Sequence, residues 1–438
     1  MKGIVRGFSG SQCFIVLALL IVCAPAAVLA QSDGANRAAV ALSLADAERM
    51  MLEKNRELQV ARRAQESARA DSMVAGQGAN PTLTLQTLNI NPSLGVGAGA
   101  LREKTVDTTV RIDQLIERGE KRELRVAAAE RLEAASDADF SEIKRQQGLV
   151  LRNAYYELAL AQEKSAVLAE TASLFEKSLA AADRRLSAGD IARAELARLR
   201  VDALRASNDA RAAEADRSRA QIAFAYIVGM EADARAIRAT DPWPQPEAAP
   251  AGGLSQELIA RRPDVRAAQA RVEAAERSRE LARRLRTRDV TVGAQYEHWP
   301  QSDANQQGTG NSFGVAISIP LFVRHTFGGE IRRAEVDYDA ARDSLARVRA
   351  QATGEFERAW SDLLSAADRV RRFNDGLLAE ARRSAESAEY AYKNGALGLM
   401  DLLDARRTLR ATQIDAAVAL ADYAKALAAW RASTTLAE

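Results

Sequence analysis

Proline is distributed very unevenly along this chain of 438 residues. All ten prolines lie outside the tracts 93–241 and 321–438. An interior proline costs a helix about 3 kcal/mol, and both tracts are rich in the good helix formers Ala, Leu, Glu, Arg and Gln. Together with an aromatic content of only 5%, this distribution predicts a mainly α-helical protein.

Local signals place two of the expected helices. Ser43 is a predicted N-cap, and the helical pattern that follows it continues to about Val74. Residues 119–187 stay helical with only Gly148 interrupting, which at about 1.5 Å per residue gives one element of roughly 100 Å. Alanine-rich stretches at 158–161 and 180–182 favour helices packed side by side as in coiled coils. From the helices alone, a soluble periplasmic coiled coil is as good an interpretation as any other.

The first thirty residues have the three parts of a secretory signal peptide. Lys2 and Arg6 precede an apolar run over 14–22, and small residues follow up to Ala30. We therefore expect residues 1–30 to be removed from an exported mature chain. Its charge would then be balanced, with 59 basic and 59 acidic side chains, which gives no electrostatic reason to expect a nucleic-acid partner.

Both cysteines, Cys13 and Cys23, lie in this segment. A mature chain that begins after Ala30 has no disulfide, no redox thiol and no thiolate ligand for a metal. Lipid modification of Cys23 stays open, although Val22 before it is bulkier than the small residue that such processing prefers. The rest of the chain has no apolar run near the ~20 residues of a transmembrane helix, so entry into a membrane would require strands.

The two halves of the chain repeat the same order of parts at an offset of 205–207 residues. Each half has a helix, two strand-like runs, a very long helix, a glycine turn and a returning helix, with Gly189 of the first half matching Gly395 of the second. We predict a first structural repeat over 31–240 and a second over 254–438. The proline-rich segment 241–253 is expected to be an extended linker between them.

Four short runs alternate with a period of two, which is typical of strands. They cover 82–90, 106–114, 290–297 and 313–319, and the first loses its phase at Gln86 and Thr87, where a bulge is expected. One face of each run is apolar and the other polar, as in strands of outer-membrane barrels. Two hairpins of a small sheet on a soluble protein are the alternative.

The number of runs matters because a β-sheet can span a lipid bilayer only as a closed barrel. The smallest such barrels have about eight strands. Four strands in a membrane therefore require other subunits.

Several segments, in this order and inside a duplicated frame, resemble the TolC family of outer-membrane efflux channels. The matching pieces are Leu-Ser-Leu-Ala-Asp-Ala at 42–47, Arg-Arg-Pro-Asp-Val at 261–265, Val-Ala-Ile-Ser-Ile-Pro-Leu-Phe at 315–322, and Gly395 followed by Asp-Leu-Leu-Asp-Ala at 401–405. The segments 399–410 and 423–430 look most like the heavy-metal branch of the family, of the cobalt-zinc-cadmium type.

The resemblance implies a homotrimer in the outer membrane that extends into the periplasm. Each subunit would lend four strands to one twelve-stranded transmembrane β-barrel and its helices to one hollow α-helical barrel. Such a channel is the exit duct of a tripartite pump, joined through a periplasmic adaptor (membrane fusion) protein to an inner-membrane RND transporter. The branch implies heavy-metal cations such as cobalt, zinc, cadmium or nickel as cargo; a duct for drugs or other organic compounds and a periplasmic coiled-coil adaptor without a pore are the alternatives.

The resemblance also implies a periplasmic gate beside the two glycine turns. Asp401 and Asp404 match acidic rings of the family, Tyr392 a gate tyrosine, and Glu195 an acidic residue of the neighbouring turn. Leu397 departs from the pattern, because antibiotic exporters of the family often carry an arginine there that locks the gate. Carboxylates in the first turn of a helix also gain about 0.3–1 kcal/mol from its dipole without any pore, so a capping role stays open.

Other conspicuous residues have ordinary explanations. His298 and His325 have no cysteine or helical partner nearby, so we expect interfacial or loop positions rather than a metal site. Trp299 and Phe322 suit an aromatic girdle. The arginines of the second turn either grip an adaptor or form a solvated face; they are Arg406, Arg407 and Arg410.

The sequence lacks the motifs of an enzyme. It contains no nucleophile elbow and no Gly-rich phosphate loop, and two histidines are too few for most imidazole chemistry. We therefore expect no catalytic activity and no cofactor.

Overall fold

A computed structural model describes residues 39–88, 90, 106–246, 256–301 and 310–434. The expected signal peptide with Cys13 and Cys23 and the linker residues 247–253 lie outside the described residues. The described residues belong to one unit that begins at Ala39. They are mainly helical with a small β part, as the sequence predicts.

The helices differ greatly in length. They are α1 (Leu44–Lys54), α2 (Arg56–Ala75), α3 (Lys121–Ala188), α4 (Arg193–Val228), α5 (Gln256–Arg261), α6 (Pro263–Arg284), α7 (Gly328–Arg372), α8 (Leu378–Lys393) and α9 (Leu399–Thr434), with a 3-10 turn at Glu231–Ala236 and a π-helical turn at Phe373–Leu377. The strands are β1 (Val40–Leu42), β2 (Thr82–Leu88), β3 (Asp107–Ile116), β4 (Ile237–Ala239), β5 (Val290–Trp299) and β6 (Gly310–Ser318). The 68 residues of α3 confirm the predicted long helix.

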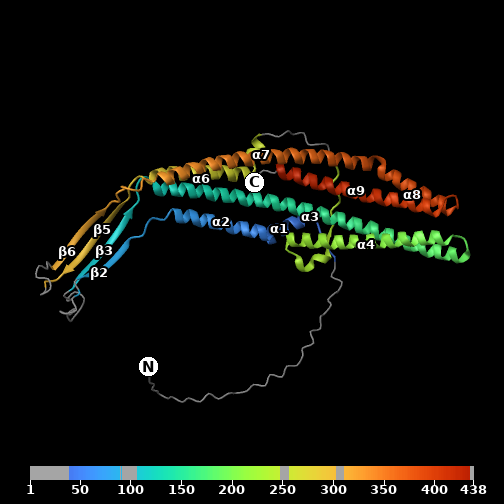
Figure 1. Cartoon of the computed structure of the whole chain (residues 1–438), viewed down its shortest axis with the longest axis horizontal. Coiled ribbons are helices and arrows are strands. Elements are labelled where there is room, and N and C mark those ends of the chain that lie inside the picture. The colour runs from blue at the N-terminus through green and yellow to red at the C-terminus, as the bar shows by residue number, and fades with distance from the viewer. Residues whose placement is uncertain (1–38, 89, 91–105, 247–255, 302–309, 435–438) are drawn as a thin grey trace, which may run out of the picture. The chain divides into compact units, whose positions relative to one another are not determined.

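Alanine and leucine explain how α3 packs along most of its length. It runs beside α2, α4, α6 and α9 (Figure 1). Its buried positions include Ala128, Ala135 and Ala138, where small side chains permit a close approach, and the larger Leu151 and Leu158 further along. Gly148 is accommodated within the helix.

The first helical stretch starts and ends close to the predicted positions, but it is divided into two helices. The Ser43 hydroxyl accepts a hydrogen bond from the Asp46 amide at 3.1 Å, which confirms the N-cap. The helix then breaks at Asn55, whose side-chain oxygen caps α2 by accepting from the Leu58 amide at 3.1 Å. The Asn55 amide group also donates to the Ile227 carbonyl at 3.1 Å, so a contact from a distant part of the chain fixes the break.

Strands β2, β3, β5 and β6 form one antiparallel sheet in that order, with β2 and β6 at its edges (Figure 1). Thr82–Leu88 pairs one-to-one with Asp113–Asp107, so the bulge expected at Gln86 and Thr87 is absent from the described part of this strand. The alternation of apolar and polar side chains is lost at the end of β2 because Leu88 lies on the polar face of the sheet. The backbone pairing with β3 nevertheless continues to Leu88.

The register gathers the apolar side chains on one face of the sheet. One row across the four strands is Leu83, Ile112, Ala294 and Val315, and the next is Leu85, Val110, Tyr296 and Phe313. Phe313 and Val315 are 84% and 79% exposed, far more than a protein core allows. This face is therefore built to meet an apolar medium or another chain.

The opposite face of the sheet is polar. Arg111 donates two hydrogen bonds of 2.8 Å to the Asp113 carboxylate, and Gln295 lies 3.5 Å away. Gly293 lies beside this pair, and a Cβ there would come within 2.3 Å of an Asp113 oxygen. The glycine thus makes room for the ion pair to lie against the sheet.

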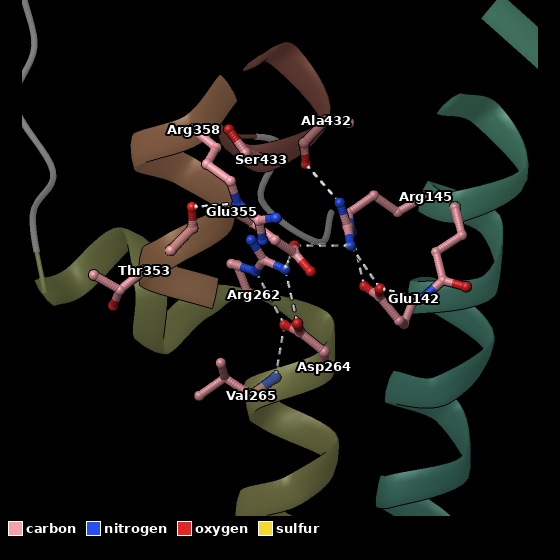
Figure 2. A network of polar contacts seen from close by, with 12 residues as sticks. Glu142, Arg145, Arg262, Asp264, Val265, Thr353, Glu355, Arg358, Ala432 and Ser433 are labelled. Carbon is pink, nitrogen blue, oxygen red and sulfur yellow. Dashed lines mark hydrogen bonds and ion pairs between the residues drawn. The ribbon is translucent and has the colours of Figure 1, made fainter. Parts of the chain in front are cut away.

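A buried polar network joins four helices around Arg262 (Figure 2). This side chain is 1% exposed and donates to Asp264 on α6 and to Glu355 on α7, each at 2.8 Å. Glu355 lies 4.0 Å from Arg145 of α3, which also donates to the Ala432 carbonyl of α9. Burial opposes the charge of Arg262, but the hydrogen bonds with Asp264 and Glu355 outweigh it and raise the pKa of the guanidinium.

A second set of buried hydrogen bonds centres on Tyr155. Its side chain is 1% exposed and lies within the hydrophobic core around β1 and β4. Its hydroxyl donates to the Leu42 carbonyl at 3.1 Å and accepts from the amides of Thr240 at 3.1 Å and Asp241 at 3.0 Å. The two three-residue strands β1 and β4, which the sequence analysis did not identify, pair in parallel beside this hydroxyl. One side chain thus holds the start of the described chain and the start of the proline-rich segment against α3.

Replacing Tyr155 with Phe tests this set of hydrogen bonds. The substitution leaves the Asp241 amide without its partner, whereas the Leu42 carbonyl and the Thr240 amide still bond to each other. We therefore expect it to destabilise the protein by about 1 kcal/mol and to lower the melting temperature in detergent. Tyr156→Phe is the matched control, since that ring stacks on Trp243 and its hydroxyl makes no hydrogen bond to the described residues. Equal melting temperatures for Tyr155→Phe and the wild type, measured by circular dichroism, would contradict the role of the hydroxyl.

Candidate functional site

The two glycine turns have the same local geometry. Gly189 ends α3 with φ of 82°, and Gly395 follows α8 with φ of 74°, a conformation that side-chain-bearing residues rarely adopt. The residue after each glycine donates to a carbonyl five residues back, at 2.8 Å in the first turn and 2.9 Å in the second. Both helices therefore end in a Schellman motif, and each chain reverses within a few residues into α4 or α9.

A hydrophobic cluster holds the two turns together. Its buried members are Phe175, Ala182, Leu196, Leu199, Ala203, Ala206, Leu399, Leu402 and Leu403, from α3, α4 and α9. Tyr392 of α8 packs against this cluster and accepts a hydrogen bond of 3.1 Å from Arg185 of α3. The structure therefore brings the predicted gate tyrosine into contact with the other turn.

The predicted acidic residues lie at the helix starts, outside this cluster. Asp401 and Asp404 are exposed and flank the buried Leu402 and Leu403 of α9. Their side chains make no ion pair or hydrogen bond with other described residues. Glu195 lies half-buried in the first turn of α4, one residue before the buried Leu196. Within one chain, the two aspartates thus share an exposed face, with Glu195 on a separate helix.

Asp401 also has the position of a helix-dipole carboxylate. It lies in the first turn of α9, and one of its oxygens would be 3.3 Å from a Cβ built on Gly398. A capping role for Asp401 does not exclude a role in a pore. Asp404 lies one turn further along α9 and gains less from the helix dipole, so capping accounts for Asp401 better than for Asp404.

The arginines of α9 are engaged within the chain. Arg407 pairs with Asp202 of α4 at 2.5 Å, Arg406 with Glu389 of α8 at 3.3 Å, and Arg410 with Asp209 of α4 at 3.6 Å. The three side chains stay partly exposed, so both sequence interpretations, an adaptor grip and a solvated face, stay predictions. Their acidic partners could not be found from the sequence because they lie on other helices.

The Glu389 carboxylate pairs with two cationic side chains, Lys393 and Arg406. Hydrogen bonds with Lys393 at 2.9 Å and with Arg406 hold the pKa of this carboxyl below its usual value. It lines an open cleft of about 310 Å³ together with Leu174, Tyr392, Leu399 and Arg406. Because its pKa is lowered, this contact contributes to stability at neutral pH and is lost only as the pH falls through the lowered value.

Each of the two histidines lies close to one polar side chain. His298 lies in β5 with Nδ1 2.8 Å from Asn311, and His325 precedes α7 with Nε2 2.9 Å from Glu330. Across the described residues, no three side chains of His, Cys, Asp or Glu lie close enough to hold a metal ion. None of the described helices combines the length and apolar composition that a membrane-spanning helix requires.

Comparison with known proteins agrees with this arrangement. The model of the family described as outer membrane efflux protein matches residues 49–230 and again residues 254–435. The cobalt-zinc-cadmium resistance protein CzcC of Cupriavidus metallidurans is 25% identical over 321 residues, which cover 73% of this chain and 75% of that protein. The pyoverdine export outer membrane protein OpmQ of Pseudomonas putida is 27% identical over 164 residues, or 37% of this chain and 35% of that protein.

The fold is that of solved outer-membrane channels. The crystal structure of the CmeC channel of Campylobacter jejuni superposes with a TM-score of 0.77 at 16% identity, covering 89% of this chain and 85% of that one. The chain belongs to the outer membrane efflux protein family, and it is an outer-membrane efflux channel rather than an enzyme.

Proposed function

We propose that this chain is the exit duct of a tripartite RND-type pump for heavy-metal cations and that it works as a homotrimer. The observation that carries the trimer is the open sheet. Among the described strands, β2 and β6 each pair with one neighbour, and one face of the sheet between them is apolar and exposed. In lipid an unpaired strand edge leaves backbone groups unsatisfied, so β6 of one copy must pair with β2 of the next. Three copies of this four-stranded sheet give a twelve-stranded barrel.

The two faces of the sheet support this assembly. The face of Phe313 and Val315 suits lipid, whereas the face of Arg111, Asp113 and Gln295 suits a water-filled lumen. The helices continue from the sheet and end at the two turns, which would place the turns at the periplasmic entrance of the same conduit. A pore-less adaptor does not account for such a sheet.

We further propose that Asp401 and Asp404 form acidic rings at that entrance. A trimer would bring six of these carboxylates around one axis, where they attract cations and repel anions. Their freedom from ion pairs with other described residues leaves their charge available. Tyr392, held by Arg185, and Glu195 on the adjacent turn would position the gate, with Gly189 and Gly395 as its turn residues.

Similarity to the cobalt-zinc-cadmium resistance protein CzcC supports cobalt, zinc or cadmium cations as cargo, and we extend the proposal to nickel. The shorter match to OpmQ favours an organic cargo as the second candidate. The two matches to one family model support the proposal of two structural repeats, 31–240 and 254–438, joined by 241–253. A periplasmic adaptor protein and an inner-membrane transporter are the proposed partners.

Removing the acidic rings should weaken block by divalent cations. For Asp401→Ala combined with Asp404→Ala, we expect the half-blocking concentration of Co²⁺ in planar bilayers to rise roughly tenfold, because local cation attraction is lost. Asp339→Ala with Asp343→Ala removes the same charge from exposed positions of α7 and should leave the block unchanged. An unchanged block in the first variant would rule out the acidic rings.

Deletion of the gene tests the cargo. We expect the deleted strain to become several-fold more sensitive to cobalt, zinc or cadmium salts, with sensitivity restored by the wild-type gene. Growth inhibition by these metal salts is compared with growth inhibition by a panel of organic toxicants and siderophores. Sensitivity confined to the organic compounds would replace the metal proposal with the second candidate.

A further inference from the structure

Four connecting segments join the sheet to the helices. They are 76–81, 117–120, 285–289 and 319–327, and we call them the junction segments. In a channel whose sheet crosses the outer membrane, these segments lie where the chain passes from lipid into the periplasm. They are therefore the part of the protein that meets the headgroups of the periplasmic leaflet.

Every carboxylate of the junction segments is occupied. Glu117 pairs with Arg125 at 2.8 Å, and Glu120 lies 3.6 Å from Arg284. Both carboxylate oxygens of Asp289 accept a hydrogen bond of 2.9 Å from the Lys121 ammonium group. One of them also accepts a hydrogen bond of 2.9 Å from the backbone amide of Arg118. The hydrogen bonds from Arg125 hold the pKa of Glu117 below its usual value, so this acid stays charged and paired at neutral pH.

The arginines of the same segments have no such partners. The side chains of Arg118, Arg286, Arg288 and Arg324 are exposed, and none forms an ion pair with a described residue. Arg286 only donates to the Thr326 carbonyl at 3.3 Å, and Arg288 lies 5.6 Å from the centre of the Phe322 ring. The junction segments therefore carry an uncompensated positive charge.

Two of these arginines lie at the same end of the β3–β5 pair. The pairing ends at Ile116 and Val290, which lie on the apolar face of the sheet. Arg118 follows Ile116 by two residues, Arg288 precedes Val290 by two, and the Arg118 amide donates to the side chain of Asp289 at 2.9 Å. Like charges gathered at one end of a strand pair repel each other unless an anion lies between them.

Apolar side chains continue beside these charges. Leu321 and Val323 are 73% and 81% exposed, and Arg324 follows them directly. An exposed apolar strip that ends in arginines matches a phospholipid, whose acyl chain and phosphate are joined in the same order.

We propose that the junction segments bind headgroups of anionic phospholipids in the periplasmic leaflet, through Arg118, Arg288 and Arg324. A zwitterionic headgroup fits less well, because its ammonium would need a free carboxylate and those of the junction segments are occupied. This inference rests on the proposed function, because only a sheet that crosses the outer membrane brings these residues to a leaflet.

Native mass spectrometry of the purified channel tests this site by titration with phosphatidylglycerol or phosphatidylethanolamine. An arginine near an anionic headgroup is worth about fivefold in affinity, so R118Q/R288Q/R324Q should weaken phosphatidylglycerol binding by roughly a hundredfold. Binding of phosphatidylethanolamine should stay the same. The control R347Q/R358Q/R372Q removes the same charge from exposed positions of α7 and should keep the preference of the wild type.

Equal binding of the two lipids by the wild type, or an unchanged preference in R118Q/R288Q/R324Q, would overturn the lipid site. Displacement of the lipid by inorganic phosphate at millimolar concentration would also overturn it, because a free anion would then suffice. Conductance in zwitterionic planar bilayers separates this test from the proposed function. A wild type that conducts but shows no lipid preference refutes only the lipid site, whereas a wild type that never conducts refutes the duct.

Discussion

The backbone hydrogen bonds at the two sheet edges constrain everything else in this protein. β2 and β6 each leave one row of N–H and C=O groups without a partner from their own sheet. Water would satisfy these groups, but the hydrocarbon of a membrane cannot, and each unsatisfied group costs several kcal/mol there. The exposed apolar face with Phe313 and Val315 requires that medium. The sheet is therefore stable in a membrane only as part of a barrel that further copies complete.

In the proposed trimer the helices would follow the symmetry of the barrel, because they continue from the strands. α3 carries the chain over 68 residues from the sheet to Gly189, and the second half returns through Gly395. Between these ends the helices pack through several hydrophobic clusters, and buried polar groups add specific links between them. Arg262 joins α6 to α7, and Tyr155 holds β1 and the proline-rich segment against α3. The two turns therefore lie side by side, and ion pairs join α9 to α8 and α4 beside them.

The sequence predicted features that depend on local periodicity. Proline-free tracts located the long helices, alternation located the four strands, and Gly189 and Gly395 marked the turns. It missed features that depend on distant contacts: the break at Asn55 needs Ile227, and the role of Arg407 needs Asp202 of another helix. β1 and β4 are too short to show a period. The exposed position of Asp401 and Asp404 follows from their spacing beside buried leucines, but their arrangement around an axis depends on other copies of the chain.

Disulfide trapping between copies tests the closure of the barrel most directly. β2 and β6 of one sheet are separated by two strands at spacings of about 4.8 Å, which is beyond the reach of a disulfide. A cysteine at Leu85 combined in turn with one at each position from 311 to 317 can therefore only bond between chains. The account predicts that oxidation in outer membranes gives, for some of these pairs, a covalent ladder that ends at three chains. A ladder that continues past three chains, or no interchain bond at any position, would contradict it.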